Sequence, residues 1–153
     1  IWGNDRLQNY ETICGGTGAG PDFNGCSAIQ THMTNTRATD PEVLEHRFPV
    51  RLEEVSIRRG SGGAGRHRGG DGIVRRLRFL DEMTVTTLCS HRRVPPFGVA
   101  GGEPGEVGRE WIERADGGHI PHQGNDQNQV FPGDVFVLHT PSGGGYGPDE
   151  GQV

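Results

Sequence analysis

Glycine and polar residues that could form a binding site are concentrated in two stretches near the start of the chain, residues 12–20 and 31–37. Glycines in the first stretch free the backbone to adopt positive φ and allow another surface to approach closely, because no Cβ intervenes. The second stretch supplies hydroxyl, imidazole, amide and guanidinium groups, and a guanidinium can hold a carboxylate or phosphate through two parallel hydrogen bonds. The two stretches therefore predict one side of a polar site, or else side chains that satisfy the backbone of a long irregular segment.

The candidate site residues come from these two stretches. His32 could donate, accept or relay a proton, although a histidine held in place by structural hydrogen bonds is an equally good interpretation. We take His32, Asn35 and Arg37 as candidate catalytic residues. The candidate substrate-binding residues, which offer hydroxyls or open backbone, are Thr12, Gly15, Gly16, Thr17, Gly18 and Thr36.

Two further motifs have weaker claims to chemistry. Residues 60–65 match the G-x-G-x-x-G pattern of dinucleotide-binding loops, but arginine and histidine follow them where that motif requires a helix. We therefore expect residues 59–72 to be a flexible, arginine-bearing hairpin or flap over a substrate or a subunit interface. His119 and His122 could bind a divalent metal together with nearby aspartates, yet their spacing matches no helical face and their surroundings predict a loose loop. We accordingly predict no metal ligand in this chain.

Composition excludes several classes of function. The chain has 153 residues, of which 31% are hydrophobic, with 27 glycines and 10 prolines, so we expect an ordered, turn-rich β structure that leans on further sequence. A net charge of −5 argues against a nucleic-acid partner. All 15 basic residues are arginine, which excludes both a P-loop lysine and a Schiff-base lysine within this chain.

The cysteines and the lengths of the apolar runs indicate the cellular compartment of the protein. Three cysteines without a C-x-x-C spacing are typical of reduced thiols in a cytosolic protein. No long apolar run or basic-then-apolar start occurs, so we predict neither a membrane span nor a signal peptide. We therefore expect a cytoplasmic protein with no membrane partner.

Local signals predict one short helix near residues 40–47. Thr39 or Asp40 can cap its start, Pro41 suits the first turn, and Glu42 favours the positive end of the helix dipole. The pair Phe48-Pro49 must end it, because the residue before a proline is disfavoured in helical conformation.

Alternation of apolar and polar residues predicts strands over most of the remaining chain. In residues 50–57 the apolar phase shifts by one position, and a bulge near Glu53 and Glu54 would return the apolar residues to one face. Further strands are expected within 73–79, 83–90, 109–114 and 135–138, whereas 98–108 and 116–129 are expected to be loops and 24–33 is undecided between helix and extended chain. The predicted fold is mainly β, a sandwich or barrel-like antiparallel sheet with long glycine-rich loops.

Several motifs in order resemble the C-terminal part of the hydantoinase B/5-oxoprolinase family. They are residues 10–13 (YETI), the glycine-rich run to Pro21, 31–37 (THMTNTR), 40–45 (DPEVLE), 59–65 (RGSGGAG), 69–72 (GGDG) and 141–147 (PSGGGYG). Members of this family are several times longer, so the resemblance implies a C-terminal fragment. Residues 1–153 would form a single unit, with a loop and site segment over 1–49 and a β-rich part over 50–153.

The resemblance also implies an activity. Enzymes of this family open cyclic amides such as 5-oxoproline or hydantoins at the expense of ATP, and relatives carboxylate ketones. ATP and a divalent metal are implied for the complete enzyme but not for this chain, because a hydantoinase A-type subunit or domain handles ATP and the metal ligands lie in the missing N-terminal part of the same subunit. Residues 12–20 and 31–37 would line or buttress the site of a small cyclic amide, while the isolated fragment would be inactive. A ketone carboxylase subunit and a non-catalytic, subunit-docking domain are the alternatives.

Overall fold

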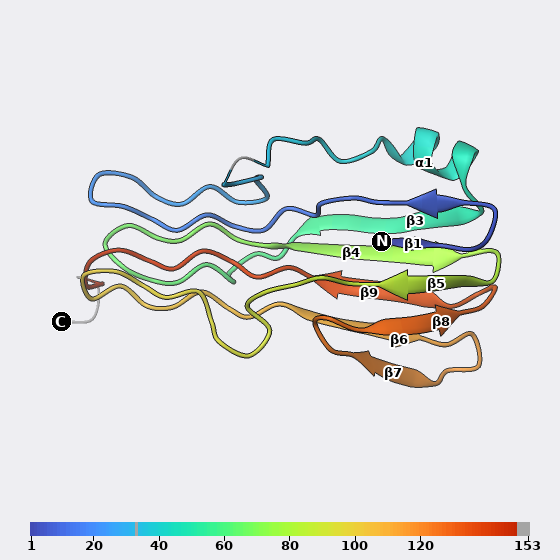
Figure 1. Ribbon diagram of the computed structural model, residues 1–153. Coiled ribbons are helices and arrows are strands. Elements are labelled where there is room, and N and C mark those ends of the chain that lie inside the picture. The colour runs from blue at the N-terminus through green and yellow to red at the C-terminus, as the bar shows by residue number, and fades with distance from the viewer. Residues whose placement is uncertain (33, 150–153) are drawn as a thin grey trace.

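Two antiparallel sheets form the protein in a computed structural model that describes residues 1–32 and 34–149 (Figure 1). The four-stranded sheet has the order β2-β1-β5-β8, with β1 (Trp2–Gly3), β2 (Gln8–Asn9), β5 (Met83–Thr86) and β8 (Gln127–Val130). The five-stranded sheet has the order β3-β4-β9-β6-β7, with β3 (Val50–Ile57), β4 (Ile73–Phe79), β6 (Arg109–Glu113), β7 (His119–His122) and β9 (Val135–His139). Neither sheet closes on itself, so the predicted mainly β fold is confirmed as a sandwich and not a barrel.

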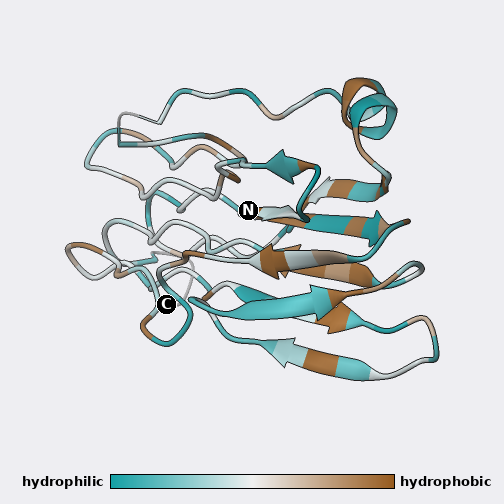
Figure 2. Cartoon of the chain, turned by 45° about the vertical axis from the view of Figure 1, so that its right-hand side comes forward, coloured by the Kyte–Doolittle hydropathy of each residue, from teal (hydrophilic) through white to brown (hydrophobic). Residues whose placement is uncertain are grey.

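One apolar core lies between the two sheets. Trp2 and Val85 from the four-stranded sheet meet Leu77, Phe79 and Phe136 from the five-stranded sheet, and all five are at least nine-tenths buried. The Trp2 ring packs edge-on against Phe79 at a centroid distance of 5.9 Å, a favourable arrangement for two aromatic quadrupoles. In Figure 2 the apolar residues accordingly concentrate on the strands and the helix.

The single helix among the described residues, α1 (Pro41–Arg47), starts and ends where its local signals predict. The Asp40 side chain accepts a hydrogen bond from the Glu42 backbone N–H at 2.9 Å and so satisfies a group that the first turn leaves unpaired. Leu44 is completely buried and joins the inter-sheet core. No helix in the described ranges is long and apolar enough to cross a membrane.

The predicted bulge in β3 is confirmed. The pairing with β4 shifts between Leu52 and Glu54, which leaves Glu53 as the additional residue. Val55 therefore lies opposite Arg75, on the same face as the core residues of β4, as the change of phase predicts.

The loop prediction for residues 116–129 is wrong, whereas residues 59–72 form the predicted hairpin connection, between antiparallel strands β3 and β4, and not the flap. Residues 116–129 contain β7 and part of β8, short polar strands at the sheet edges, and His122 is 3% exposed. Residues 59–72 are not a free flap: they are hydrogen-bonded on both sides to other glycine-rich segments, and Ser61 and Asp71 within them are buried. The undecided residues 24–32 form no helix, and Met33 lies outside the described residues.

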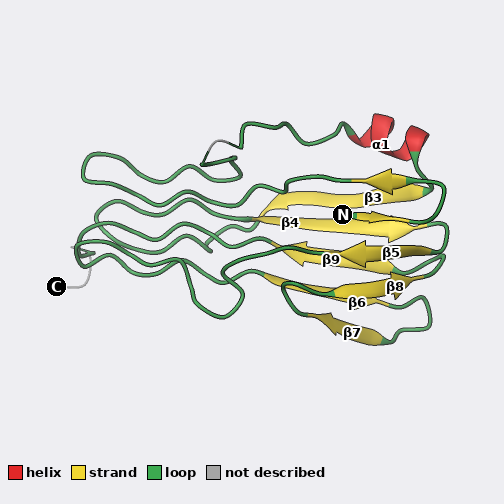
Figure 3. Cartoon of the chain, viewed as in Figure 1, coloured by secondary structure: helices red, strands yellow, loops and turns green. Residues whose placement is uncertain are grey.

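Glycine-rich segments without regular secondary structure form the other half of the molecule, beyond the strand ends (Figure 3). We call residues 14–26, 60–72, 96–106 and 140–147 the glycine layer. Its backbones are hydrogen-bonded to one another, with Gly143 donating to the Gly70 carbonyl at 2.8 Å and Gly70 donating to the Thr17 carbonyl at 2.9 Å. Residues 140–147 continue directly from β9, so the central strand of the sheet passes into the middle of this layer.

Close approach of backbones explains why these positions are glycine. A Cβ built on Gly143 would lie 1.7 Å from the Thr17 carbonyl oxygen, and one built on Gly69 would lie 2.0 Å from the Gly143 carbonyl oxygen. Real Cβ atoms do not come within 3.0 Å of another heavy atom, so any side chain would force two backbones apart. The layer is therefore an ordered, hydrogen-bonded part of the fold.

Alanine at Gly16 should destabilise the protein far more than alanine at Gly18. A Cβ on Gly16 would lie 1.9 Å from the Gly70 carbonyl oxygen, whereas one on Gly18 would meet nothing closer than 3.8 Å. We expect Gly16→Ala to lower the free energy of unfolding by at least about 2 kcal/mol and Gly18→Ala to change it by less than about 1 kcal/mol. Urea denaturation of both variants measures this, and equal small effects would contradict close packing at Gly16.

Candidate functional site

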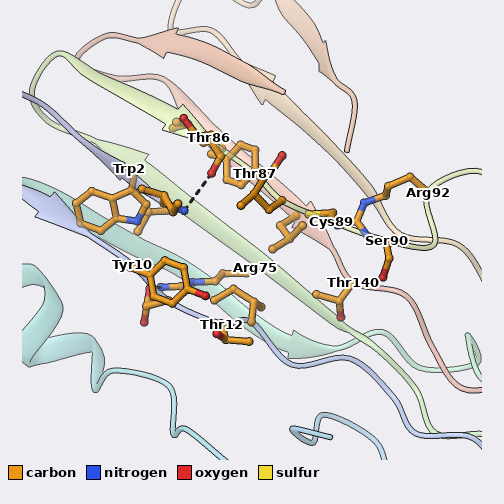
Figure 4. Close-up of a pocket in the computed structure, with 18 of the residues that line it drawn as sticks. Trp2, Tyr10, Thr12, Arg75, Thr86, Thr87, Cys89, Ser90, Arg92 and Thr140 are labelled. Carbon is orange, nitrogen blue, oxygen red and sulfur yellow. Dashed lines mark hydrogen bonds and ion pairs between the residues drawn. The ribbon is translucent and has the colours of Figure 1, made fainter. Parts of the chain in front are cut away.

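A cavity of about 290 Å³ opens between the two sheets, beside the glycine layer (Figure 4). Its floor is apolar and comes from both sheets, with Trp2 and Val85 on one side and Leu77, Phe136 and Leu138 on the other. Its polar rim includes Thr86, which ends β5, and Thr12, Thr87, Ser90 and Thr140, which lie in segments outside the strands. An apolar pocket with a few converging polar groups is the usual form of a small-molecule site.

A buried ion pair forms part of the cavity wall. Arg75 donates to a Glu11 carboxylate oxygen at 2.8 Å, and each side chain is 10% exposed. Burial alone would raise the pKa of Glu11, but the charge and hydrogen bond of Arg75 outweigh it and hold that pKa below its ordinary value. Nε of Arg75 is buried and lacks a hydrogen-bond partner within the described part of the chain.

The residues that line the cavity are better suited to binding a ligand than to catalysing a reaction. Glu11 is the only carboxylate among the residues that line the cavity, and Arg75 neutralises it. Burial raises the pKa of the Cys89 thiol, which therefore stays protonated and weakly nucleophilic. The cavity can hold a small ring against its apolar floor while hydroxyl groups on the rim bond to a polar edge of that ring.

The predicted site residues occupy three different environments, and only Thr12 lines this cavity. Gly15, Gly16, Thr17 and Gly18 belong to the glycine layer. The Thr17 hydroxyl accepts a hydrogen bond from the Cys26 backbone N–H at 2.7 Å, and Gly15 and Gly16 pack against neighbouring backbones. Packing and hydrogen bonding thus give Gly15, Gly16 and Thr17 a structural role, whereas a Cβ on Gly18 would meet only the Gly144 carbonyl oxygen at 3.8 Å; the contact of all four with substrate stays a prediction.

The candidate catalytic residues lie on the exposed segment that leads into α1. His32 has a positive φ of 54°, and its Nδ1 lies 2.9 Å from the neighbouring Thr31 hydroxyl. Asn35, Thr36 and Arg37 are exposed and make no side-chain hydrogen bond or ion pair with the described residues. These four side chains do not line the cavity, so they are available to a ligand or a neighbouring domain, and their catalytic role stays a prediction.

Metal binding has no support in the described residues, which contain no cluster of three or more histidine, cysteine or acidic side chains. His119 and His122 lie on one strand three positions apart, so their side chains point to opposite faces. Both ring nitrogens of His122 already have protein partners, Thr87 and Asn128. His119 and His122 therefore do not fit a shared metal site.

Sequence reasoning missed Arg75 and Cys89, which the fold brings to the cavity. The sequence did hold a signal for Arg75. It lies two positions from both Ile73 and Leu77, so its side chain points to the same, buried face of β4. An arginine in phase with core residues needs a buried acidic partner. Cys89 gives no comparable signal, because a lone cysteine in a polar stretch has no distinctive pattern.

Comparison with known proteins identifies the family. The family model described as hydantoinase B/oxoprolinase matches residues 2–149. The chain belongs to the hydantoinase B/oxoprolinase family. Among its relatives, 5-oxoprolinase of Dictyostelium discoideum is 43% identical over 99% of this chain, and the caprolactamase beta subunit of Pseudomonas jessenii is 36% identical over 71% of it.

Solved structures share this hydantoinase B fold. The ATP-dependent caprolactamase from Pseudomonas jessenii superimposes with a TM-score of 0.74 at 28% identity and covers 89% of this chain. Acetone carboxylase in its nucleotide-free form has a TM-score of 0.70 at 19% identity over 87% of this chain, a likeness of fold alone. The chain spans only 12% of the length of the Dictyostelium 5-oxoprolinase and 25% of the caprolactamase chain.

Replacing Arg75 by methionine should destabilise the protein by about 3 to 5 kcal/mol, because it leaves Glu11 buried and unpaired. The double variant Arg75→Met with Glu11→Gln should recover most of that loss. The folded pKa of Glu11 is lowered, so the pair stabilises the protein above the unfolded pKa and its contribution disappears as the pH falls through the folded pKa. Denaturation of each variant at neutral and acidic pH measures this, and additive losses in the double variant would contradict the pairing.

Proposed function

We propose that this chain is the C-terminal portion of an ATP-dependent cyclic-amide hydrolase subunit that opens 5-oxoproline or hydantoin rings. The observation that carries the proposal is the 43% identity to a 5-oxoprolinase over 99% of this chain. A second cyclic amide, caprolactam, is the substrate of another relative, the ATP-dependent caprolactamase of Pseudomonas jessenii. The whole enzyme works in the cytoplasm with a hydantoinase A-type subunit or domain that handles ATP.

The geometry of the inter-sheet cavity supports a small cyclic amide as its ligand. The methylene groups of such a ring suit the apolar floor formed by Leu77, Val85 and Phe136. The amide edge has one acceptor and one donor, which the rim hydroxyls of Thr12 and Thr140 can match. In this proposal the cavity binds and orients the ring and excludes water from its apolar side.

Ring opening itself needs chemistry that the described residues do not provide. A lactam is a weak electrophile, and phosphorylation of its oxygen by ATP would make the ring carbon open to attack by water. The chain has no lysine for a P-loop, and its described residues contain no metal cluster. The exposed His32, Asn35 and Arg37 would therefore meet the reacting groups only where another part of the enzyme packs against them.

A non-catalytic docking domain is the second candidate, and one observation favours it. The segment with His32 and Arg37 is exposed, as a surface that packs against another part of the enzyme would be. Under this candidate those side chains hold subunits together and do not touch substrate.

Turnover assays should find activity only in the complete enzyme. The assay compares this chain alone with a full-length subunit combined with its hydantoinase A-type partner, using ATP with 5-oxoproline, hydantoin, caprolactam or acetone. We expect turnover of a cyclic amide by the complex and none by the isolated chain. Carboxylation of acetone without hydrolysis of any cyclic amide would contradict the hydrolase proposal and favour a carboxylase.

Alanine variants separate the catalytic candidate from the docking candidate. In the complete enzyme, His32→Ala and Arg37→Ala should each lower kcat at least about a hundredfold, the low end of what a positioned acid, base or charge supplies. His46→Ala and Arg47→Ala on α1 are matched controls, because they remove the same exposed side-chain types nearby. Normal kcat with weakened subunit assembly in the first pair would instead establish docking.

A further inference from the structure

A buried polar cluster joins the two sheets at the end formed by β7 and β8. His122 on β7 belongs to the five-stranded sheet, whereas Asn128 on β8 belongs to the four-stranded sheet and Thr87 directly follows β5. Nε2 of His122 lies 2.8 Å from the Thr87 hydroxyl, and Nδ1 lies 2.8 Å from the Asn128 amide nitrogen. His122 is 3% exposed, so its two nitrogens bond to protein and not to bulk water.

The hydrogen-bond network determines the protonation state of this histidine. The Asn128 amide nitrogen donates one hydrogen to Nδ1 of His122 and lies 3.2 Å from a carboxylate oxygen of Asp126, which accepts the other. Nδ1 must therefore be an acceptor and carry no proton. The Thr87 hydroxyl donates to the Gly124 carbonyl, so it accepts from Nε2. Only the neutral ring with its proton on Nε2 satisfies every partner.

A buried carboxylate extends the cluster to the chain after β5. Glu110 on β6 has a fully buried side chain, and one of its oxygens accepts from the Gly124 backbone N–H at 2.7 Å. The other oxygen accepts from Arg92 Nε at 2.5 Å. Arg92 lies so close over Gly108 that a Cβ there would come within 2.3 Å of its guanidinium. Gly124 thus donates its backbone N–H to Glu110 and accepts a hydrogen bond from Thr87 at its carbonyl.

The segment that this cluster holds separates two cavities. Cys89, Ser90 and Arg92 line both the inter-sheet cavity and a second, more open cavity of about 710 Å³ beside β6 and β7. The backbone N–H of Cys89 donates to the Asn125 side chain at 2.8 Å, which ties this wall to the turn between β7 and β8. The wall therefore depends on bonds to the same turn that His122 stabilises.

We propose that His122, Thr87, Asn128 and Gly124 form an acid-sensitive latch that holds residues 87–92 in place as the wall between the two cavities. A proton added to Nδ1 of His122 would face the Asn128 N–H at 2.8 Å, where two donors repel and the bond between the sheets is lost. The latch is closed at neutral pH and opens as His122 takes up its proton.

Some of the charged groups around His122 raise its pKa and others lower it. Asp126 beside β8 and Glu110 on β6 favour the charged ring, whereas Arg92 and the α-amino group of Ile1 oppose it. The Phe136 ring on β9 packs edge-on at 5.3 Å and adds no charge. Burial is the largest effect, and together these groups lower the pKa of His122 below its ordinary value.

Proton linkage gives the direction of the pH dependence. An exposed histidine in the open form has a pKa of about 6.5, above that of the closed form, so the open form binds more protons over the interval between them. The equilibrium constant for opening should therefore increase up to about tenfold for each pH unit lost below about 6.5, until the closed-form pKa is reached.

Amide hydrogen exchange of the protein between about pH 7.5 and about pH 5 tests the latch without any substitution. After correction for intrinsic exchange rates, protection of the Cys89 and Gly124 amides relative to Leu77 in central strand β4 should stay constant above about pH 6.5 and fall by up to about tenfold per pH unit below it. Nitrogen NMR of His122 should show the neutral Nε2–H form at about pH 7.5. Unchanged relative protection, or a protonated Nδ1 at that pH, would overturn the proposal.

Two variants add a matched comparison. Asn128→Asp provides Nδ1–H with an acceptor and a negative charge, so the pKa of His122 should rise and the acid-induced loss of protection should disappear. His119→Gln, which removes the exposed histidine of the same strand, should keep the wild-type pH dependence. Loss of the dependence in His119→Gln, or its persistence in a folded Asn128→Asp protein, would contradict the assignment to His122.

Discussion

Direct contact between backbones in the glycine layer is the constraint on which the rest of the structure depends. Gly16, Gly69 and Gly143 each place a bare Cα where a neighbouring carbonyl oxygen would exclude any side chain. This approach allows segments from four parts of the chain to exchange backbone hydrogen bonds without forming regular strands. A chain with only 31% hydrophobic residues thereby gains an ordered half that needs few apolar side chains.

The same layer positions the inter-sheet cavity. Residues 60–72 of the layer lead directly into β4, and β9 leads directly into residues 140–147. The five-stranded sheet and the layer are therefore one continuous structure. Thr12 and Thr140 lie where the chain crosses from layer to sheet, and both line the cavity. The buried pair Glu11 and Arg75 is at this boundary too. Membership in the hydantoinase B/oxoprolinase family gives this arrangement its context, and the cyclic amide is the ligand that we propose for it.

Local signals made much of the fold predictable. Asp40 and Pro41 start α1, Phe48 ends it, and the change of phase in β3 marks its bulge. Long-range partners were not predictable: Glu11 is 64 positions from Arg75, and His122 becomes a buried strand residue only through contacts with distant chain. The glycine motifs show that some group comes close to the backbone, but they do not show whether that group is a ligand or another segment of the chain. The same residues therefore fit either a binding loop or a packed layer. The predicted catalytic role of His32 and Arg37 stays a prediction, because both side chains are exposed and lie outside the cavity.

Amide hydrogen exchange of the glycine layer under native conditions tests the central claim most directly. If the layer is a hydrogen-bonded part of the fold, the amides of Gly63, Gly70, Gly143 and Gly145 should be protected to the same degree as the amides of β4 and β9. Protection factors near unity at these glycines, with protected strands, would show that the segments are mobile loops. That result would contradict the account of the layer as the support of the cavity.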